Sequence, residues 1–215
     1  MKPRLQNHVF EPLKIALLGL MLALLGCGPD ADEVRNAPLP TKTAAPAVQV
    51  PLGPEFSEDR PYVVTERTAE EKELLKEFGE QLHQKLVDGA GSTNKLDRVE
   101  RAAICLRSLG LEVSNGGMHQ YYFNSSGEFA METPEVLRRI GARDLARIVT
   151  EANLLFGSAG PNPDWEERRK QLREMDEQAN KRFDELTHRY YQVMDRSDLS
   201  ERFDDYVVAE RTKSQ

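Results

Sequence analysis

The side chains best suited to chemistry fall within one short segment, residues 112–128. His119 could move a proton near neutral pH, Gln120 could hold an oxygen, and Glu112 or Glu128 could be the partner acid or base. No nucleophile–base pair, metal-ligand set or phosphate-binding loop accompanies them in the sequence. One histidine beside an amide is more often structural, so an enzyme is only one of three hypotheses.

The same segment also has the features of a binding or packing motif. Two adjacent glycines predict backbone that needs a positive φ or a close approach by another element. The aromatic residues 121–123 diverge by about 100° each on a helix, so they must divide between interior and surface. The candidate binding residues are Asn115, Gly116, Gly117, His119, Gln120, Tyr121, Tyr122 and Asn124. An equal alternative is fold maintenance, with the amides satisfying buried groups where helices cross and residues 124–127 forming a turn.

Metal and disulfide chemistry is not expected. Beyond residue 26, His83, His119 and His188 are scattered, and Cys105 lies in an apolar helical pattern. Cys105 is therefore expected to be a small buried hydrophobic residue rather than a nucleophile. We predict no metal, no cofactor and no intramolecular disulfide.

The N-terminus is basic and then apolar. Three basic residues precede an apolar run over residues 15–25, too short to span a bilayer, and Gly26 then precedes Cys27. Residues 1–26 thereby resemble a bacterial lipoprotein signal peptide. The resemblance implies that Cys27 carries acyl chains such as palmitate, which anchor the protein to a lipid bilayer of the cell envelope. The residue after Cys27 is Gly28 rather than Asp. In a bacterium with two membranes, this implies that the lipoprotein is sorted to the outer membrane rather than the inner one.

Composition separates a tether from a folded part. Residues 27–67 hold Cys27 and a Pro-rich stretch without a sustained apolar period, which predicts a disordered tether. The whole chain has a formal net charge of −7, with acids and bases mixed along the sequence. A nucleic-acid partner would need a basic patch, so none is expected.

Helical patterns begin at the end of this tether. Thr68 and Glu71 are spaced as a capping box, and the apolar positions that follow predict a helix ending at Gly89. A second helix is expected from about Asn94 to near Gly110.

Further helices are predicted toward the C-terminus. One begins at residues 133–135, where Pro falls in the first turn, and Gly141 interrupts it. Asp164 is spaced to cap a stretch of some thirty residues without Gly or Pro, either one long arm or two helices bent near Asn180. A short helix from Leu199 follows. The sequence predicts an all-α fold: one compact domain of about six to eight helices over residues 68–215.

A longer motif carries a family resemblance. The run Asn-Gly-Gly-x-x-Gln-Tyr-x-x-Asn-Ser-Ser-Gly over residues 115–127, followed by residues 135–137 and 140–142, resembles the C-terminal domain family of a bacterial DNA-mimic protein. The similarity covers roughly residues 70–195. It implies an all-α domain of mostly unassigned activity, one member of which binds a DNA-binding protein by imitating duplex charge.

Three functions follow from these observations. The favoured one is a membrane-anchored binding module whose partner is an envelope protein or a wall component. The second is an envelope enzyme with a site around His119 and Gln120. The third is an acidic mimic of nucleic acid, which the predicted export and the modest net charge disfavour, because duplex DNA carries one charge per about 1.7 Å.

Overall fold

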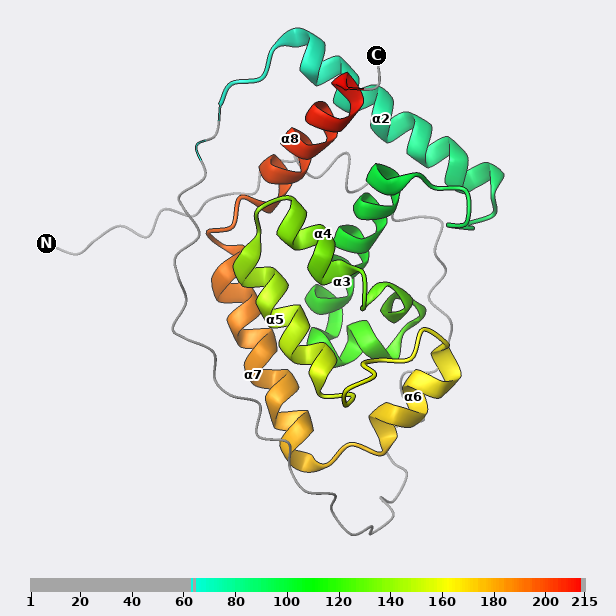
Figure 1. The fold of residues 1–215 in the computed structure, drawn as a ribbon, viewed down its shortest axis with the longest axis vertical. Helices are drawn as coiled ribbons and strands as arrows, with labels where there is room; N and C mark the ends of the chain where they lie inside the picture. The colour runs from blue at the N-terminus through cyan, green and yellow to red at the C-terminus, as the bar shows by residue number, and fades with distance from the viewer. Residues whose placement is uncertain (1–62, 64, 214–215) are drawn as a thin grey trace, which may run out of the picture.

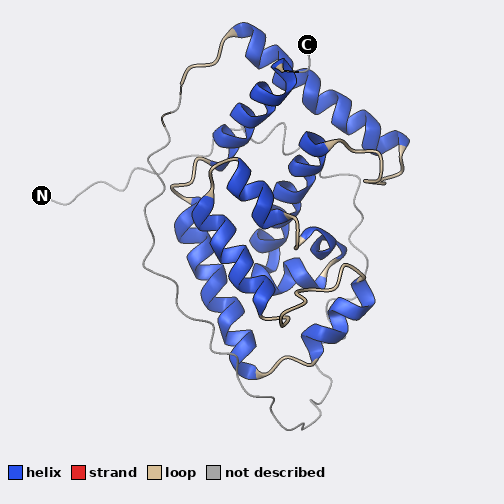
Figure 2. Cartoon of the chain, in the orientation of Figure 1, coloured by secondary structure: helices blue, strands red, loops and turns tan. Residues whose placement is uncertain are grey.

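The computed structural model describes Val63 and residues 65–213, and this part of the chain contains helices and no strands (Figures 1 and 2). The α-helices are α2 (Ala69–Asp88), α3 (Arg98–Phe123), α4 (Thr133–Arg139), α5 (Arg143–Leu154), α6 (Trp165–Arg173), α7 (Glu177–Met194) and α8 (Leu199–Thr212), and η2 (Ser125–Phe129) is a 3₁₀ helix. The all-α prediction is confirmed. The predicted signal peptide, Cys27 and the tether up to residue 62 lie outside the described residues.

Helix α3 forms the centre of the domain (Figure 1). It contacts α4, α6, α7 and α8, while α5 packs against both α4 and α7. Helix α2 lies against α8, at the end of the domain where the C-terminus also lies (Figure 1). The fully buried core includes Leu109, Val113, Leu137, Leu145, Ile148 and Leu186. Within the described residues, no helix has the length and apolar character needed to cross a membrane.

The helix starts follow side-chain capping. Thr68 and Glu71 form the predicted reciprocal capping box of α2. Asp97, three residues after the predicted start, caps α3 because its carboxylate accepts from two free amides of the first turn. Pro134 lies in the first turn of α4, and the Asp164 carboxylate accepts from the Glu167 amide at the start of α6.

Two predicted boundaries are wrong. Gly110 does not end the second helix, because its bare backbone faces the hydroxyl of Tyr190 on α7 and the helical hydrogen bonds continue past it. The stretch after Asp164 does divide into two helices, but the break comes before Asp176 rather than near Asn180. Asp176 is the N-cap of α7, since its carboxylate accepts from the Ala179 amide.

Cys105 is fully buried and has a free thiol, as expected. Burial raises the pKa of this thiol to about 12, so it stays protonated and unreactive near neutral pH. Its place is in the core of α3, away from solvent.

Candidate interaction site

The Asn-Gly-Gly motif breaks α3. Gly117 has a φ of +77°, a conformation that only glycine adopts readily, so the amide of Met118 loses its helical partner. The hydroxyl of Thr187 on α7 replaces that partner, accepting from the Met118 amide at 2.9 Å and donating to the Phe183 carbonyl at 2.8 Å. A Cβ on Gly117 would lie 3.0 Å from the same hydroxyl. The break therefore sets the second half of α3 directly against α7.

The predicted amides converge on one carboxylate. Glu112, which is buried, accepts from Asn124 at 2.7 Å, from Ser126 at 2.9 Å and from Gln120 at 3.3 Å. A Cβ on Gly116 would collide with the side chain of Gln120, so glycine is what lets this amide fold back toward Glu112. The hydrogen-bonding capacity of these side chains is directed into the fold, while Asn115 is exposed beside the break.

The tyrosines of the motif are core residues. Tyr121 and Tyr122 are fully buried, and burial raises the pKa of both phenols. The hydroxyl of Tyr121 bonds to that of Thr133 at 2.9 Å, and the hydroxyl of Tyr122 donates to the Asn153 side-chain oxygen at 2.7 Å. Neither ring reaches the surface, so neither can meet a partner without unfolding.

A fully buried arginine closes the C-terminal end of α3. Arg168 of α6 is 0% exposed and donates to the carbonyls of Tyr122 at 2.7 Å and Asn124 at 2.8 Å. It also donates to the carbonyls of residues 162 and 163, at 2.7 and 3.0 Å. A cation at this place suits the negative end of the helix dipole. Burial lowers its pKa from the usual high value, which still leaves the group charged at neutral pH.

At the surface, two rings of the motif pack with a tryptophan and an arginine of α6. Arg169 lies between two aromatic rings, 4.2 Å from the ring centre of Phe123 and 4.7 Å from that of Trp165. The ring of His119 stacks on that of Phe123, at 6.2 Å between ring centres. We call His119, Phe123, Trp165 and Arg169 the aromatic–arginine stack.

The geometry of the stack is fixed by its attachment to the backbone. The Trp165 indole donates to the Phe123 carbonyl at 2.8 Å while its ring stays 42% exposed. His119 is exposed, but its ring also meets the edge of Phe183 at 6.0 Å. Burial lowers the pKa of His119, with Asp184 opposing the change, which favours the neutral imidazole at pH 7.

The predicted acid–base combination is not assembled. Within residues 65–213, no hydrogen bond joins His119 to Glu112 or Glu128, because Glu112 faces the amides and His119 faces two phenylalanine rings. The described residues also contain no group of three His, Cys, Asp or Glu side chains placed to hold a metal ion.

Several residues that organise this region lie outside the motif, so the motif does not predict them. Arg168, Arg169 and Thr187 come from helices 40 to 70 residues further along the chain, as their contacts show. The one available hint is Trp165, the only tryptophan of the chain, directly after the Asp164 cap.

Comparison with known proteins gives one match. A family model described as DMP19-like protein matches residues 94–210, which run from just before α3 into α8 and include the whole aromatic–arginine stack. The matched range begins later and ends later than the 70–195 expected from the motif, leaving out α2. No curated protein and no solved structure matches the chain.

Proposed function

The chain belongs to the DMP19-like protein family, and on that premise we propose that it is a binding module held at a bacterial membrane, with a protein of the cell envelope as its partner. The domain is all-α, and its family model covers more than half of the chain. Binding is favoured over catalysis because the polar groups of the motif support the fold, whereas aromatic and cationic groups remain at the surface.

The observation that carries this proposal is the half-buried guanidinium of Arg169, which packs over two aromatic rings at the surface. Tryptophan and arginine are among the residue types that contribute most to protein–protein binding energy, and lysine is depleted at such interfaces. The indole hydrogen bond to the Phe123 carbonyl and the sandwich around Arg169 hold both side chains in place. A partner therefore meets groups that are already ordered, which lowers the entropic cost of association.

Anchoring through Cys27 is the second half of the proposal, and it rests on the sequence. The first described residues fit such an arrangement, since Arg67 donates to the Asp205 carboxylate of α8 at 2.6 Å and so fixes where the N-terminal segment meets the domain. The partner would then share the membrane or lie within reach of the tether.

Charge imitation of DNA is less well supported. Such mimicry needs rows of unpaired carboxylates. In the matched region, Glu151 lies between Arg182 at 2.9 Å and Arg189 at 2.6 Å, and Glu132 accepts two hydrogen bonds from Arg101. These carboxylates are each paired with arginines of the same domain.

The binding proposal is tested with a photo-cross-linking side chain at His119 of the full chain, in intact cells. His119 is an exposed member of the stack, whereas the same probe at Tyr122 would lie in the core. We expect one discrete adduct with an envelope protein, and none from a probe at Val87, which is similarly exposed but lies on α2. Arg169→Glu should abolish the adduct and leave the melting temperature within a few degrees of wild type. Equal adducts from both probe positions would overturn the proposal.

The anchor is tested separately. Cys27→Ala should abolish acyl labelling and leave either unprocessed precursor or a differently cut soluble product. Unchanged size and unchanged membrane retention would refute anchoring without touching the binding proposal.

A further inference from the structure

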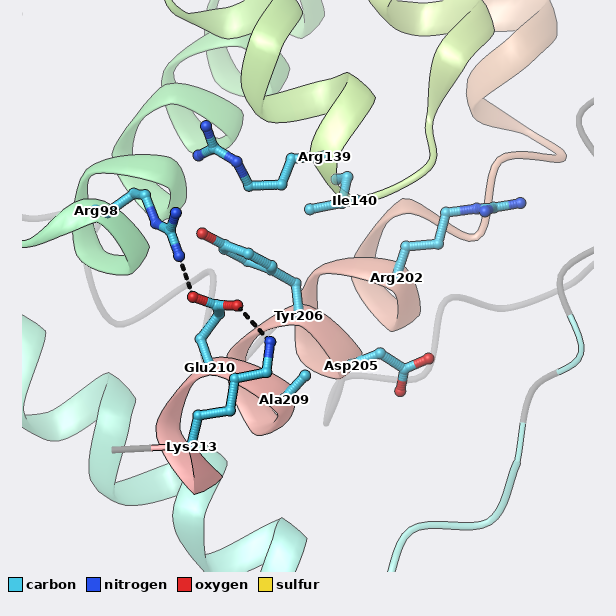
Figure 3. Close-up of a pocket in the computed structure, with 9 residues that line it drawn as sticks. All are labelled: Arg98, Arg139, Ile140, Arg202, Asp205, Tyr206, Ala209, Glu210 and Lys213. Carbon is cyan, nitrogen blue, oxygen red and sulfur yellow. Dashed lines mark hydrogen bonds and ion pairs between the residues drawn. The ribbon is translucent and has the colours of Figure 1, made fainter. Parts of the chain in front are cut away.

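A second polar region lies at the opposite end of α3. A concavity of about 490 Å³ opens between the start of α3, the end of α4 and α8 (Figure 3). Ligand sites in proteins usually enclose about 300–1,000 Å³, so the space suits a small ligand or a headgroup. Its basic lining residues are Arg98, Arg139, Arg202 and Lys213.

One hydroxyl beside this concavity has no acceptor. Tyr206 is only 9% exposed, and its hydroxyl finds no acceptor among the described residues, although the guanidinium of Arg98 lies close enough to interact with its oxygen. In Figure 3 this hydroxyl points between the side chains of Arg98 and Arg139. An unsatisfied buried hydroxyl destabilises a fold, and a ligand that supplied an acceptor here would relieve that cost.

The carboxylates beside it are already engaged. Asp205 accepts from Arg67 at 2.6 Å, and Glu210 pairs with Arg98 and, at 3.0 Å, with Lys213. Arg139 has a looser ion pair, 3.5 Å from Glu135, which does not line the concavity. The balance of charge around the Tyr206 hydroxyl is therefore positive, in a chain whose net charge is −7.

We propose that this concavity binds a phosphate group. A phosphate oxygen can accept from the Tyr206 hydroxyl, while the planar guanidinium of Arg139 bonds two further oxygens. Glu210 lies between Arg98 and Lys213, so the phosphate binds beside this carboxylate, on the side of Arg139. The group belongs either to a free phosphate compound or to a lipid headgroup, and the two sources share this chemistry.

The chain offers a matched pair of variants for the test. Arg138 and Arg139 are neighbours on α4, and both contact Glu135, but only Arg139 lines the concavity. Arg139→Gln and Tyr206→Phe should each weaken phosphate binding about tenfold, since each removes donors to a charged ligand. Arg138→Gln should leave binding within about twofold. Glu210→Gln should strengthen binding severalfold, because it removes the competing carboxylate.

The measurement titrates the purified full chain in detergent with inorganic phosphate at constant ionic strength. Binding is followed by the shifts of the backbone amide signals in the NMR spectrum, and chloride is the control. A second arm measures sedimentation with vesicles of phosphatidylglycerol and phosphatidylcholine against phosphatidylcholine alone. Saturable phosphate binding with the expected variant pattern supports the proposal with a free phosphate source. The same pattern on anionic vesicles alone supports it with a lipid source. No saturable binding in either arm, or equal losses from Arg138→Gln and Arg139→Gln, would overturn it.

Discussion

Arg168 and Tyr206 lie at opposite ends of α3 and differ in how their polar atoms are satisfied. The guanidinium of Arg168 is fully buried and bonded to backbone carbonyls of residues 122, 124, 162 and 163. The hydroxyl of Tyr206 is nearly as buried but has no acceptor among the described residues, and basic side chains surround it. We refer to these regions as the closed end and the open end of α3.

The two ends differ in whether their polar groups stabilise the fold or remain available for binding. At the closed end, the amides and tyrosines of the sequence motif form hydrogen bonds within the domain. Only the aromatic–arginine stack is left at the surface to meet a partner. At the open end, no motif is visible in the sequence, yet a polar atom is left for something outside the chain. The density of polar residues in the motif therefore does not by itself mark a ligand site.

Removing the cation of the closed end should have the largest effect. Arg168→Met leaves four carbonyls without their donor in a dry interior, so we expect a loss of about 3–5 kcal/mol in the free energy of unfolding. Urea unfolding followed by circular dichroism measures it. Lys170→Met, on the exposed face of the same helix, should stay within about 0.5 kcal/mol. A small effect of Arg168→Met would mean that the closed end is held by apolar packing alone.

The next largest effect is expected at the break in α3. Gly117→Val combines a strained positive φ with a collision against Thr187, so it should cost about 2–3 kcal/mol and lower the melting temperature by several degrees. Gly157 also has a positive φ, of +88°, but has open space where a Cβ would be. Gly157→Val therefore isolates the φ strain. Equal losses at the two glycines would show that the contact with α7 adds nothing.

A matched pair of hydroxyl deletions compares the two ends directly. Tyr122→Phe breaks the bond to Asn153 and should cost about 1–2 kcal/mol, because the amide oxygen is left buried. Tyr206→Phe removes a hydroxyl that donates to no described acceptor, so stability should stay within about 0.5 kcal/mol or rise. Thermal unfolding of both variants without added anions gives the answer. A clear loss from Tyr206→Phe would show that its hydroxyl is already satisfied.

The smallest effect concerns pH at the open end. Burial raises the pKa of the Asp204 carboxyl on α8 from 3.8 to about 6, with Arg67 opposing the change. The folded state then holds the proton more tightly than the unfolded chain, so stability falls as the pH rises from about 4 to 6. Asp204→Asn should exceed wild type by up to about 1 kcal/mol at pH 7.5, since the side chain is 37% exposed and partly screened, and should give no gain at pH 4. Equal gains at both pH values would exclude titration of Asp204 as the cause.

The fold was largely predictable because its helix ends are local. The capping pair of Thr68 and Glu71, the proline of α4 and the glycine at position 141 each act within one turn, so the sequence reveals them directly. Gly110 misled the prediction because a glycine inside a helix costs only about 1 kcal/mol, which a close neighbour such as Tyr190 can offset.

The site was only partly predictable, because its partners are distant in the sequence. The motif located the break in α3, and His119 lies in the stack, but the burial of Tyr122 depends on Asn153, 31 residues away. Arg168 gave no signal, since a buried arginine is rare and its acceptors are backbone carbonyls, which every residue has. The open end is assembled from three helices by tertiary packing, which single-sequence periodicity does not reveal.

The contact between Arg168 and the Tyr122 carbonyl also bears on the order of folding. These residues are 46 positions apart, so the last turn of α3 stays uncapped until α6 has docked. The end of α3 and the whole of α6 should consequently open as one cooperative unit in hydrogen exchange, separately from α2 and α8. A loop insertion that delays α6 would then slow the maturation of the surface that carries Trp165, even though the central turns of α3 had already formed.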